Sequence, residues 1–420
     1  MSEGRSALLL GEDARMLLAS ARALGREGVA VDVAWCPSGS AALRSRFVRR
    51  ALALPSPTDG DDGDWRSALA EAMRAGAYDL VLPATEAALV PLQAEHARWS
   101  SCPELVLVDP AAWEAFGDKT RTAELARSAG VPVPRTVPVT GPADLDGALA
   151  ELAFPVVVKP VRSLRAERAD RKDYACICAD EAELRGAVAD LAARGATAMV
   201  QEHVDGRGVG VELLGHGGRI LTAFQHVRLH ETIGHGSTYR MSEPLDPELL
   251  EWSERLVGAL GFSGLAMVEY RVGATRRVLL EVNARRWGAI PLAVGAGASF
   301  PAYLFQLRVD GDQEPPREYR AGVRSRDLYA AARWTLRSLS GAGGRSSGDD
   351  QEQGWRGNRI GAGRVARDVG RGLIGRDRID SFAWDDPRPV LTDVGRVLRL
   401  VVRKPLRFLR SRLGPKDAGR

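Results

Sequence analysis

Two short apolar segments in the second half of the chain each carry a single glutamate. Glu269 lies in residues 265–272 and Glu281 lies in residues 277–282, and a short polar turn joins the two segments. Because side chains alternate between the two faces of a strand, this spacing predicts a hairpin in which Glu281 and Asn283 share one face. The partner strand then places Glu269 beside them. Buried carboxylates are unfavourable unless they are compensated, so the hairpin must face a cation or a strong hydrogen-bond donor.

Two carboxylates and one amide oxygen are the hard donors that Mg²⁺ prefers when it is held together with nucleotide phosphates. Such an ion neutralises charge that develops during phosphoryl transfer. Arg285 lies two residues beyond Asn283 and shares its face if the strand continues, so its guanidinium can bind a phosphoryl group or an acyl phosphate. The alternative is that each glutamate pairs with an arginine such as Arg271 or Arg285.

One lysine follows an apolar run and is poorly explained by packing. Lys159 ends the sequence Pro155-Val-Val-Val, and lysine is rarely buried without a partner. Phosphate oxygens are suitable partners for its ammonium group. Lys119 follows Asp118 at the start of a predicted helix, where a lysine considered alone is usually a solvated surface residue.

The first part of the chain alternates apolar strands with helical spacing. Residues 6–35 predict a strand, a helix and a second strand, and residues 78–83 predict a further buried strand. The first strand ends on Gly11 without the full GxGxxG pattern, which argues against a dinucleotide site. A chain of 420 residues exceeds one hydrophobic core. The sequence therefore predicts an α/β unit followed by further units of mixed α and β structure.

The C-terminal part differs from the rest in charge and composition. Residues 311–420 contain 24 Lys and Arg against 14 Asp and Glu, whereas residues 1–310 contain 34 against 40. The acidic body argues against a nucleic-acid-binding surface. Residues 338–354 are rich in Gly and Ser and predict a mobile linker. The Arg-rich end, 394–413, either lies on an anionic membrane surface or packs as a solvated helix on the body.

Cysteine content and hydropathy bear on the cellular compartment. The four cysteines are too few and too scattered for a disulfide framework. No signal peptide and no uninterrupted run of about 18 apolar residues is apparent. We therefore expect a cytoplasmic protein, with peripheral membrane contact through the basic C-terminal end as an open alternative.

Histidines and one arginine cluster between Phe224 and Tyr239. Alternate positions of a strand share a face, so His226, Arg228 and His230 line one side of the segment that contains them. The candidates for a substrate-binding wall, including two from the glycine-flanked loop that follows, are His226, Arg228, His235 and Ser237. A zinc site is the less favoured alternative, because no cysteine is near and Glu231 is expected to point to the opposite face.

The order and spacing of these residues resembles the ATP-grasp superfamily, most of all its carbamoyl-phosphate-synthase-like and carboxylate-amine ligase branch. The resemblance covers about residues 5–310. The motifs that carry it are Asp118-Lys119-Thr120, Val158-Lys159-Pro160, Gln201-Glu202-His203-Val204-Asp205-Gly206, Met267-Val-Glu269-Tyr270 and Glu281-Val-Asn283-Ala-Arg285.

The resemblance implies a role for each matching position. The residues that would contact the phosphates of ATP are Lys119 and Lys159. The residues that would form the strand that binds adenine are Gln201, Glu202 and Val204. The residues that would bind Mg²⁺ or Mn²⁺ are Glu269, Glu281 and Asn283. The catalytic residues on the side of the acyl phosphate would be Arg285 and Lys159.

The resemblance also implies a fold of mixed α/β and α+β class. An N-terminal Rossmann-like α/β domain is expected first, followed by the two lobes of an ATP-grasp fold and a partly flexible basic C-terminal extension. The expected boundaries are 1–115, 116–199, 200–312 and 313–420, with the metal site in the third unit.

Two positions depart from the family pattern. Residues 161–173, where many members have a glycine-rich phosphate lid, contain no glycine but four arginines and one lysine. They either cover phosphates by charge or form a surface loop. Gly208 stands where several members place a glutamate that binds ribose, which leaves ribose recognition unassigned.

The resemblance implies an ATP-dependent ligase that phosphorylates a carboxylate and lets an amine displace the phosphate, giving an amide or peptide-like bond. One alternative is an enzyme that phosphorylates bicarbonate, as in carbamoyl-phosphate or carboxylase-like chemistry. The other is an ATP-binding module without turnover. The expected partners are a small-molecule carboxylate and an amine, and the sequence leaves open whether the chain forms a homodimer.

Overall fold

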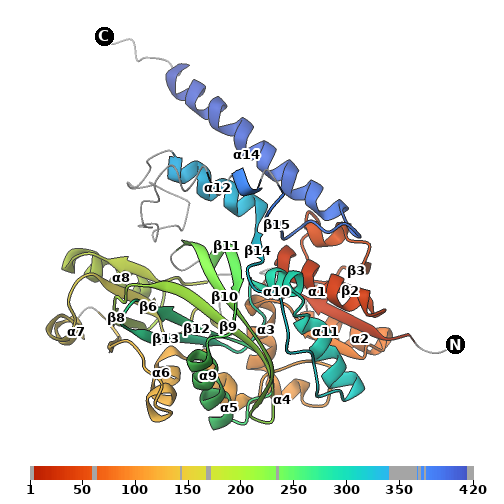
Figure 1. Cartoon of the computed structure of the whole chain (residues 1–420), viewed down its shortest axis with the longest axis horizontal. Helices are drawn as coiled ribbons and strands as arrows, with labels where there is room; N and C mark the ends of the chain where they lie inside the picture. Colours follow the sequence, from red (N-terminus) through yellow and green to blue (C-terminus); the bar gives the residue numbers. More distant parts are fainter. Residues whose placement is uncertain are drawn as a thin grey trace.

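The structure, a computed structural model, describes residues 4–58, 64–141, 144–166, 172–232, 236–339, 367, 370–372 and 375–413. These described residues form three β-sheets, with helices packed on their faces (Figure 1).

The N-terminal sheet is parallel and has the strand order β3-β2-β1-β4. Its strands are β1 (Ser6–Leu10), β2 (Ala30–Ala34), β3 (Val48–Leu52) and β4 (Leu80–Pro83). The helices of this part are α1 (Ala14–Arg26), η1 (Ala41–Arg44), α2 (Trp65–Gly76), α3 (Glu86–Ala94) and α4 (His96–Trp99). Strand β1 is buried throughout, as expected for a parallel strand covered on both faces.

The carboxyl ends of β1 and β4 lie side by side, because Leu10 is the register partner of Pro83. Each strand is followed at once by a capped helix, since Asp13 accepts hydrogen bonds from the first turn of α1 and Thr85 from that of α3. The chain changes direction across the sheet between these two strands, which is where ligands bind in open α/β sheets. The loops after β1 and β4 therefore form one edge of a candidate site.

The second sheet is antiparallel and has the order β5-β8-β6-β7. Its strands are β5 (Thr136–Val139), β6 (Val156–Pro160), β7 (Cys176–Cys178) and β8 (Ala198–Glu202). Two helices, α7 (Leu145–Glu151) and α8 (Glu181–Ala193), cover one face. In β6, Val156 and Val158 point into the core under these helices. Alternation therefore turns Lys159 to the other face of the sheet.

The third sheet has the order β13-β12-β9-β10-β11-β14-β15. Its main strands are β9 (Arg207–His216), β10 (Arg219–Thr232), β11 (Gly236–Glu243), β12 (Gly264–Val272) and β13 (Arg277–Asn283). One face packs on α5 (Pro110–Gly117), α6 (Lys119–Ser128) and α9 (Pro247–Ala259). Val268 and Tyr270 of β12 belong to that core, so Glu269 between them projects from the opposite face.

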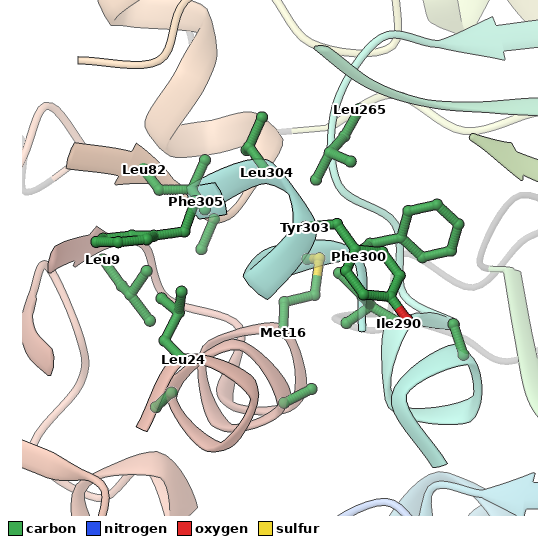
Figure 2. Close-up of a cluster of buried hydrophobic side chains, with 14 of the residues drawn as sticks. Leu9, Met16, Leu24, Leu82, Leu265, Ile290, Phe300, Tyr303, Leu304 and Phe305 are labelled. Atoms are coloured by element: carbon green, nitrogen blue, oxygen red, sulfur yellow. The ribbon is translucent and has the colours of Figure 1, made fainter. Parts of the chain in front are cut away.

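A shared hydrophobic core joins the N-terminal sheet to the third sheet. Helix α1 packs against α10 (Ile290–Ala296) and α11 (Phe300–Phe305), which the π-helical turn η4 (Gln306–Asp310) extends. Figure 2 shows Met16 and Leu24 of α1 facing Phe300 and Phe305 of α11, with Leu265 of β12 at the same core. Close packing of this kind makes the two sheets one body, so the space between them has a defined shape.

The C-terminal part contributes to the folded body. Strand β14 (Arg324–Arg326) pairs with β11, and β15 (Arg378–Ile379) pairs with β14. The third sheet thus continues beyond residue 313, the expected start of the extension. Helix α12 (Leu328–Leu339) and helix α14 (Arg388–Leu413) follow, and α14 projects from the body in Figure 1. The expected linker lies outside the described residues from position 340 to 354.

Among the described residues, no single helix has the length and apolar composition needed to cross a membrane. Only the pair Ile290–Ala296 and Phe300–Asp310 meets both requirements when taken together, and it bends by 93°. Most apolar side chains of this pair lie in the shared core.

Candidate active site

A cavity of about 630 Å³ lies where the three sheets meet. Its walls come from the loops after β1 and β4, from β6 and the end of β8, and from the exposed face of the third sheet. Most of the residues singled out by sequence line it, namely Lys119, Lys159, Gln201, Glu202, Val204, His226, Arg228, Ser237, Glu269, Glu281, Asn283 and Arg285.

The glutamates of the hairpin lie directly opposite each other. Glu269 of β12 is the register partner of Glu281 of β13. Asn283 shares the face of Glu281, and its Nδ2 donates to Glu281 Oε1 at 3.0 Å. Glu269 forms an ion pair with Arg228 of β10. The alternative, in which each glutamate pairs with an arginine, therefore holds for Glu269, whereas Glu281 pairs with Lys119. The arginines given as examples, Arg271 and Arg285, bind other carboxylates.

Two lysines approach this hairpin from the second sheet and from α6. Lys119 Nζ donates to Ser163 Oγ at 2.8 Å and lies 3.6 Å from Glu281 Oε2. Burial lowers the pKa of Lys159 to about 8, although Glu281 and Glu269 favour its charged form. Burial alone would raise the pKa of Glu281, but Lys119 and Lys159 outweigh it and hold that pKa below its usual range. The hairpin and the lysines are thus electrostatically coupled.

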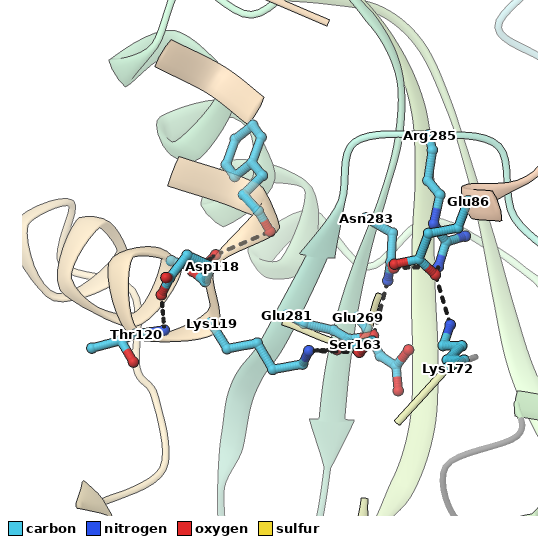
Figure 3. Close-up of polar contacts among 12 residues, drawn as sticks. Glu86, Asp118, Lys119, Thr120, Ser163, Lys172, Glu269, Glu281, Asn283 and Arg285 are labelled. Carbon is cyan, nitrogen blue, oxygen red and sulfur yellow. Dashed lines mark hydrogen bonds and ion pairs between the residues drawn. The ribbon is translucent and has the colours of Figure 1, made fainter. Parts of the chain in front are cut away.

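A third carboxylate comes from the N-terminal domain. Glu86, at the start of α3, lies between Lys172 Nζ at 2.7 Å and Arg285 Nη2 at 3.2 Å (Figure 3). Burial opposes its charged form, yet Arg285 and Lys172 lower the pKa of Glu86 to about 2. The same Arg285 Nη2 donates to Asn283 Oδ1 at 2.8 Å. Arg285 therefore links the hairpin to the edge of the parallel sheet.

The donor set of the hairpin fits a hard divalent ion. Glu269, Glu281 and Asn283 offer two carboxylates and one amide oxygen on one side of the cavity. Their charge is balanced by Arg228 and Lys119. Among the described residues, no three His, Cys, Asp or Glu side chains gather closely enough to hold a metal by themselves. An ion here would need further oxygen ligands, such as phosphate oxygens.

Comparison with known proteins places this cavity in context. A family model described as ATP-grasp in the biosynthetic pathway with Ter operon matches residues 194–330. A D-alanine–D-alanine ligase of Ectopseudomonas mendocina (strain ymp) is 28% identical over 210 residues, which cover 46% of this chain and 64% of the ligase. The chain therefore matches less than two thirds of that ligase's length.

Solved structures resemble this chain over most of its length. L-amino acid ligase from Bacillus licheniformis superposes with a TM-score of 0.57 at 19% identity, covering 77% of this chain and 79% of that one. N5-carboxyaminoimidazole synthetase from Staphylococcus aureus complexed with ADP has a TM-score of 0.57 at 15% identity, covering 77% and 82%. Residues 194–330 thus resemble ATP-grasp proteins, and the likeness to these solved structures extends over the fold of most of the chain. The expected fold, a Rossmann-like domain followed by the two lobes of an ATP-grasp unit, is confirmed.

The segment expected to bind adenine lies at the end of β8. Gln201 is buried and donates to Thr136 Oγ1 at 3.1 Å. Glu202 Oε1 accepts from the backbone N–H of Arg135 at 2.8 Å and lies 2.6 Å from Arg276 Nη2, and Glu202 Oε2 accepts from Arg135 Nε at 3.2 Å. Both Glu202 oxygens are thus engaged by protein groups, which leaves backbone atoms of this segment as the more available partners for a base.

Only some of the residues expected to bind the substrate lie as the sequence predicts. His226 is buried beside Glu212, and burial raises the pKa of that carboxyl. Ser237 Oγ donates to two backbone carbonyls of the sheet, those of His230 and Tyr239. His235 lies outside the described residues.

Strand β10 departs from simple alternation, which corrects the expected position of Glu231. Register shifts occur between Arg228 and His230 and again between His230 and Glu231. A bulge of this kind turns following side chains to the other face. His230 consequently stacks on Trp334, with ring centroids 3.7 Å apart. Glu231 lines the cavity instead of pointing away from it.

Glu231 occupies space that a side chain at position 208 would need. Its Oε1 accepts from the Gly208 N–H at 2.6 Å, and a Cβ on Gly208 would lie 2.3 Å from that oxygen. Arg271 Nη1 holds the other oxygen at 2.7 Å. A carboxylate therefore lies beside position 208, although it belongs to the neighbouring strand.

The glycine-free segment after Lys159 is described except for residues 167–171. Arg162 binds Glu114 at 2.7 Å, and Arg165 donates to backbone carbonyls of Arg194 and Gly195. These two arginines are therefore committed to protein partners. Lys172 is different, because it lines the cavity and binds Glu86.

Several cavity residues escaped the sequence prediction, namely Glu12, Thr85, Glu86, Ser163 and Lys172. Thr85 Oγ1 donates to Glu12 Oε2 at 2.5 Å, so residues 73 positions apart meet at the edge of the parallel sheet. The sequence contained a signal that could have identified Glu12 and Thr85 as cavity residues, because both come just after predicted apolar strands. The carboxyl ends of neighbouring parallel strands are the usual place for such groups.

Proposed function

We propose that this chain is an ATP- and Mg²⁺-dependent ligase that activates a carboxylate as an acyl phosphate and transfers the acyl group to an amine. The observation that carries the proposal is the convergence of Lys119 and Lys159 with Glu269, Glu281 and Asn283 around one cavity. The match of residues 194–330 to an ATP-grasp family model supports it, as does the likeness to the two amino-acid ligases named above.

In this proposal Lys119 and Lys159 bind the phosphates of ATP. When bound, Mg²⁺ held by Glu269, Glu281 and Asn283 would neutralise phosphate charge. Gln201 and Val204 would face the adenine base. Each of these groups lines the cavity.

The phosphoryl step needs little covalent chemistry from the protein. A carboxylate oxygen bonds to the γ-phosphorus while the bond from that phosphorus to the bridging oxygen breaks, and ADP leaves. Arg285 is available to hold the acyl phosphate by a paired, charge-assisted interaction. It is already fixed between Glu86 and Asn283.

The amine step follows at the acyl carbon. The amine nitrogen bonds to that carbon, the carbon–oxygen bond to phosphate breaks, and inorganic phosphate leaves with the bonding electrons. The surplus proton on the nitrogen passes to water. Positioning by fixed charged groups is the main contribution that the protein makes.

Release of ADP tests the proposal. Purified protein with Mg-ATP is assayed against a panel of carboxylates, including D- and L-amino acids, with and without amines. We expect ADP and phosphate release that depends on the carboxylate. Glu281→Gln and Lys159→Ala should each lower it by about 100-fold or more, whereas Glu254→Gln, an exposed change on α9, should leave it unchanged.

Three outcomes would contradict parts of the proposal. Full activity of Glu281→Gln and Lys159→Ala would show that the site assignment is wrong. Turnover that needs bicarbonate alone and ignores every amine would favour a carboxylating or carbamoylating reaction. Tight Mg-ATP binding without ADP release under any condition would indicate a silent ATP-binding module.

We also propose that α14 contacts anionic membrane surfaces. Leu391, Val394 and Leu398 are exposed at spacings of three and four residues, and Trp384 before the helix is 90% exposed. An exposed apolar stripe on a helix that also carries arginines is typical of interfacial binding.

A further inference from the structure

A second cavity, of about 510 Å³, adjoins the one described above. The two cavities share Glu12, Asp13, Arg15 and Ser237, so these residues form a neck between them. The second cavity, here called the outer chamber, is walled by α1 and the loop after β2 on one side. Its other wall comes from α12 and the beginning of α14. A space of this size suits a small-molecule ligand.

The C-terminal wall of the outer chamber is fixed to the body by buried ion pairs. Arg22 of α1 binds Asp386 at 2.9 Å, and both side chains are at most 5% exposed. Arg240 of β11 pairs with Asp380, which also accepts from Ser325 of β14. Removing one partner of such a pair is strongly unfavourable, so the wall is a built part of the fold.

The lining of the outer chamber differs between its neck and its far side. Glu12 and Asp13 place carboxylates at the neck, where Arg15 pairs with Asp13 at 3.0 Å. On the far side, Tyr329 lies under two guanidinium groups, with Arg396 4.2 Å and Arg333 5.9 Å from its ring centroid. Asp393 lies 3.7 Å from Arg396 on the same wall. The chamber therefore offers carboxylates close to the first cavity, and guanidinium groups with an aromatic surface and a carboxylate away from it.

We propose that the outer chamber binds the amine acceptor, and that this acceptor is an amino acid or short peptide. Its amino group would lie against Glu12 at the neck, and its carboxylate would lie against Arg333 and Arg396, where it would replace Asp393 as the partner of Arg396. Guanidinium groups bind carboxylates in a paired geometry. The inference rests on the proposed ligase function, because only an acyl phosphate in the first cavity requires a nucleophile at the neck.

In this proposal the C-terminal extension forms the wall of the outer chamber that selects the amine acceptor. The neck sets the direction of the acceptor, since an amine that enters from the outer chamber reaches the first cavity with its nitrogen leading. The new carbon–nitrogen bond forms there, the carbon–oxygen bond to phosphate breaks, and the surplus proton leaves to water.

Hydroxylamine separates the two substrate sites in an experiment. It is a small nucleophile that traps acyl phosphates as hydroxamates and needs no acceptor pocket. Full-length protein is assayed with Mg-ATP and a panel of amino-acid donors, using either hydroxylamine or a panel of amino acids and dipeptides as nucleophile. Binding of the same amino acids and dipeptides is measured by calorimetry without ATP.

We expect Arg396→Gln to raise the KM of the peptide or amino-acid acceptor and its Kd by about tenfold, with hydroxamate formation within about twofold of the unmodified protein. Arg399→Gln is the matched control, because Arg399 lies on the next turn of α14 and donates to the Gly395 carbonyl. It should change neither readout.

Acceptor coupling and binding that are unaffected by Arg396→Gln and by Arg333→Gln, alongside normal hydroxamate formation, would overturn the chamber assignment. So would a panel in which no amino acid or dipeptide binds or couples. If no donor gives a hydroxamate but acceptor binding still depends on Arg396, the result would count against the ligase function. It would support the assignment of the outer chamber as the acceptor site.

Discussion

Lys159 carries its charge in a buried position where two glutamates face it. Its pKa is lowered to about 8 by burial, so the ammonium form is present below pH 8 and is lost as the pH rises above it. Because phosphate binding needs the charged form, we expect kcat/KM for ATP to fall above about pH 8, approaching tenfold per pH unit. Lys159→Arg should keep a flat profile to about pH 9, since arginine stays charged. Identical profiles for both proteins would contradict this assignment.

Glu231 is the carboxylate nearest to the position where ribose recognition was unassigned. We propose that it binds the ribose hydroxyls, and Glu231→Gln should raise KM for ATP about tenfold through loss of a charge-assisted hydrogen bond. Gly208→Ala should act in the same direction, because its Cβ would displace the carboxylate. Steady-state kinetics with Glu254→Gln as control test this, and an unchanged KM in both variants would refute it.

Strand β10 and its neighbours show how one irregularity redistributes side chains. The register shifts after Arg228 send His230 toward Trp334 and bring Glu231 into the cavity. The hairpin of β12 and β13 also has a register shift, but it falls after Glu269, so the pairs from Asn283 to Glu281 keep the register and the glutamates meet where alternation places them. Spacing therefore predicts the faces of a strand up to a bulge and not beyond it.

The segment around β15 acts as a strap between α1 and the third sheet. Asp380→Asn should lower the free energy of unfolding by about 3–5 kcal/mol, because it leaves the buried Arg240 without its ionic partner. Asp385→Asn is the matched control, since its pair with Arg26 is about 40% exposed and should contribute less than about 1 kcal/mol. Urea denaturation measures both, and equal midpoints would show that the strap does not stabilise the body.

The shared core decides how the parts of the molecule sit together. Side chains of α1 and α11 interdigitate between the parallel sheet and the third sheet (Figure 2). This packing places the loops after β1 and β4 against the hairpin, and residues 12, 13 and 15 line both cavities. The second sheet lines only the first cavity, and its helices pack in a separate core, so a domain motion that opens the first cavity would come from this sheet.

Helix α14 extends from this body and offers a test of membrane contact. We expect cosedimentation with vesicles that contain anionic lipid, and a loss of at least about threefold on Leu391→Gln combined with Leu398→Gln, as expected from lost apolar burial. Phe154→Gln is the control, because Phe154 is 37% exposed on a different part of the protein. Equal binding by all three proteins would refute an anchor on α14.

Residue spacing alone predicted the hairpin that carries Glu269 and Glu281 and the strand that contains Lys159. It also predicted the alternating strands and helices of the first domain. Each of these depends on neighbouring residues, whose faces follow from the period of a strand or helix. Lys119 and Arg285 gained their roles from the family resemblance, and those roles stay proposals. Glu12 and Thr85 were missed because their contact depends on which strands pair, and that pairing joins positions far apart in the chain.

The sequence alone determined which residues can carry metal and phosphate chemistry, because local alternation decides which side chains leave the core together. The assembled fold decided which of them meet, since β10 is bulged, the parallel strands β1 and β4 are neighbours, and the C-terminal strap lies against α1. Those contacts arise from packing and ion pairs between residues that are distant in the chain. No local pattern encodes them, and for that reason the outer chamber became visible only when the chain was folded.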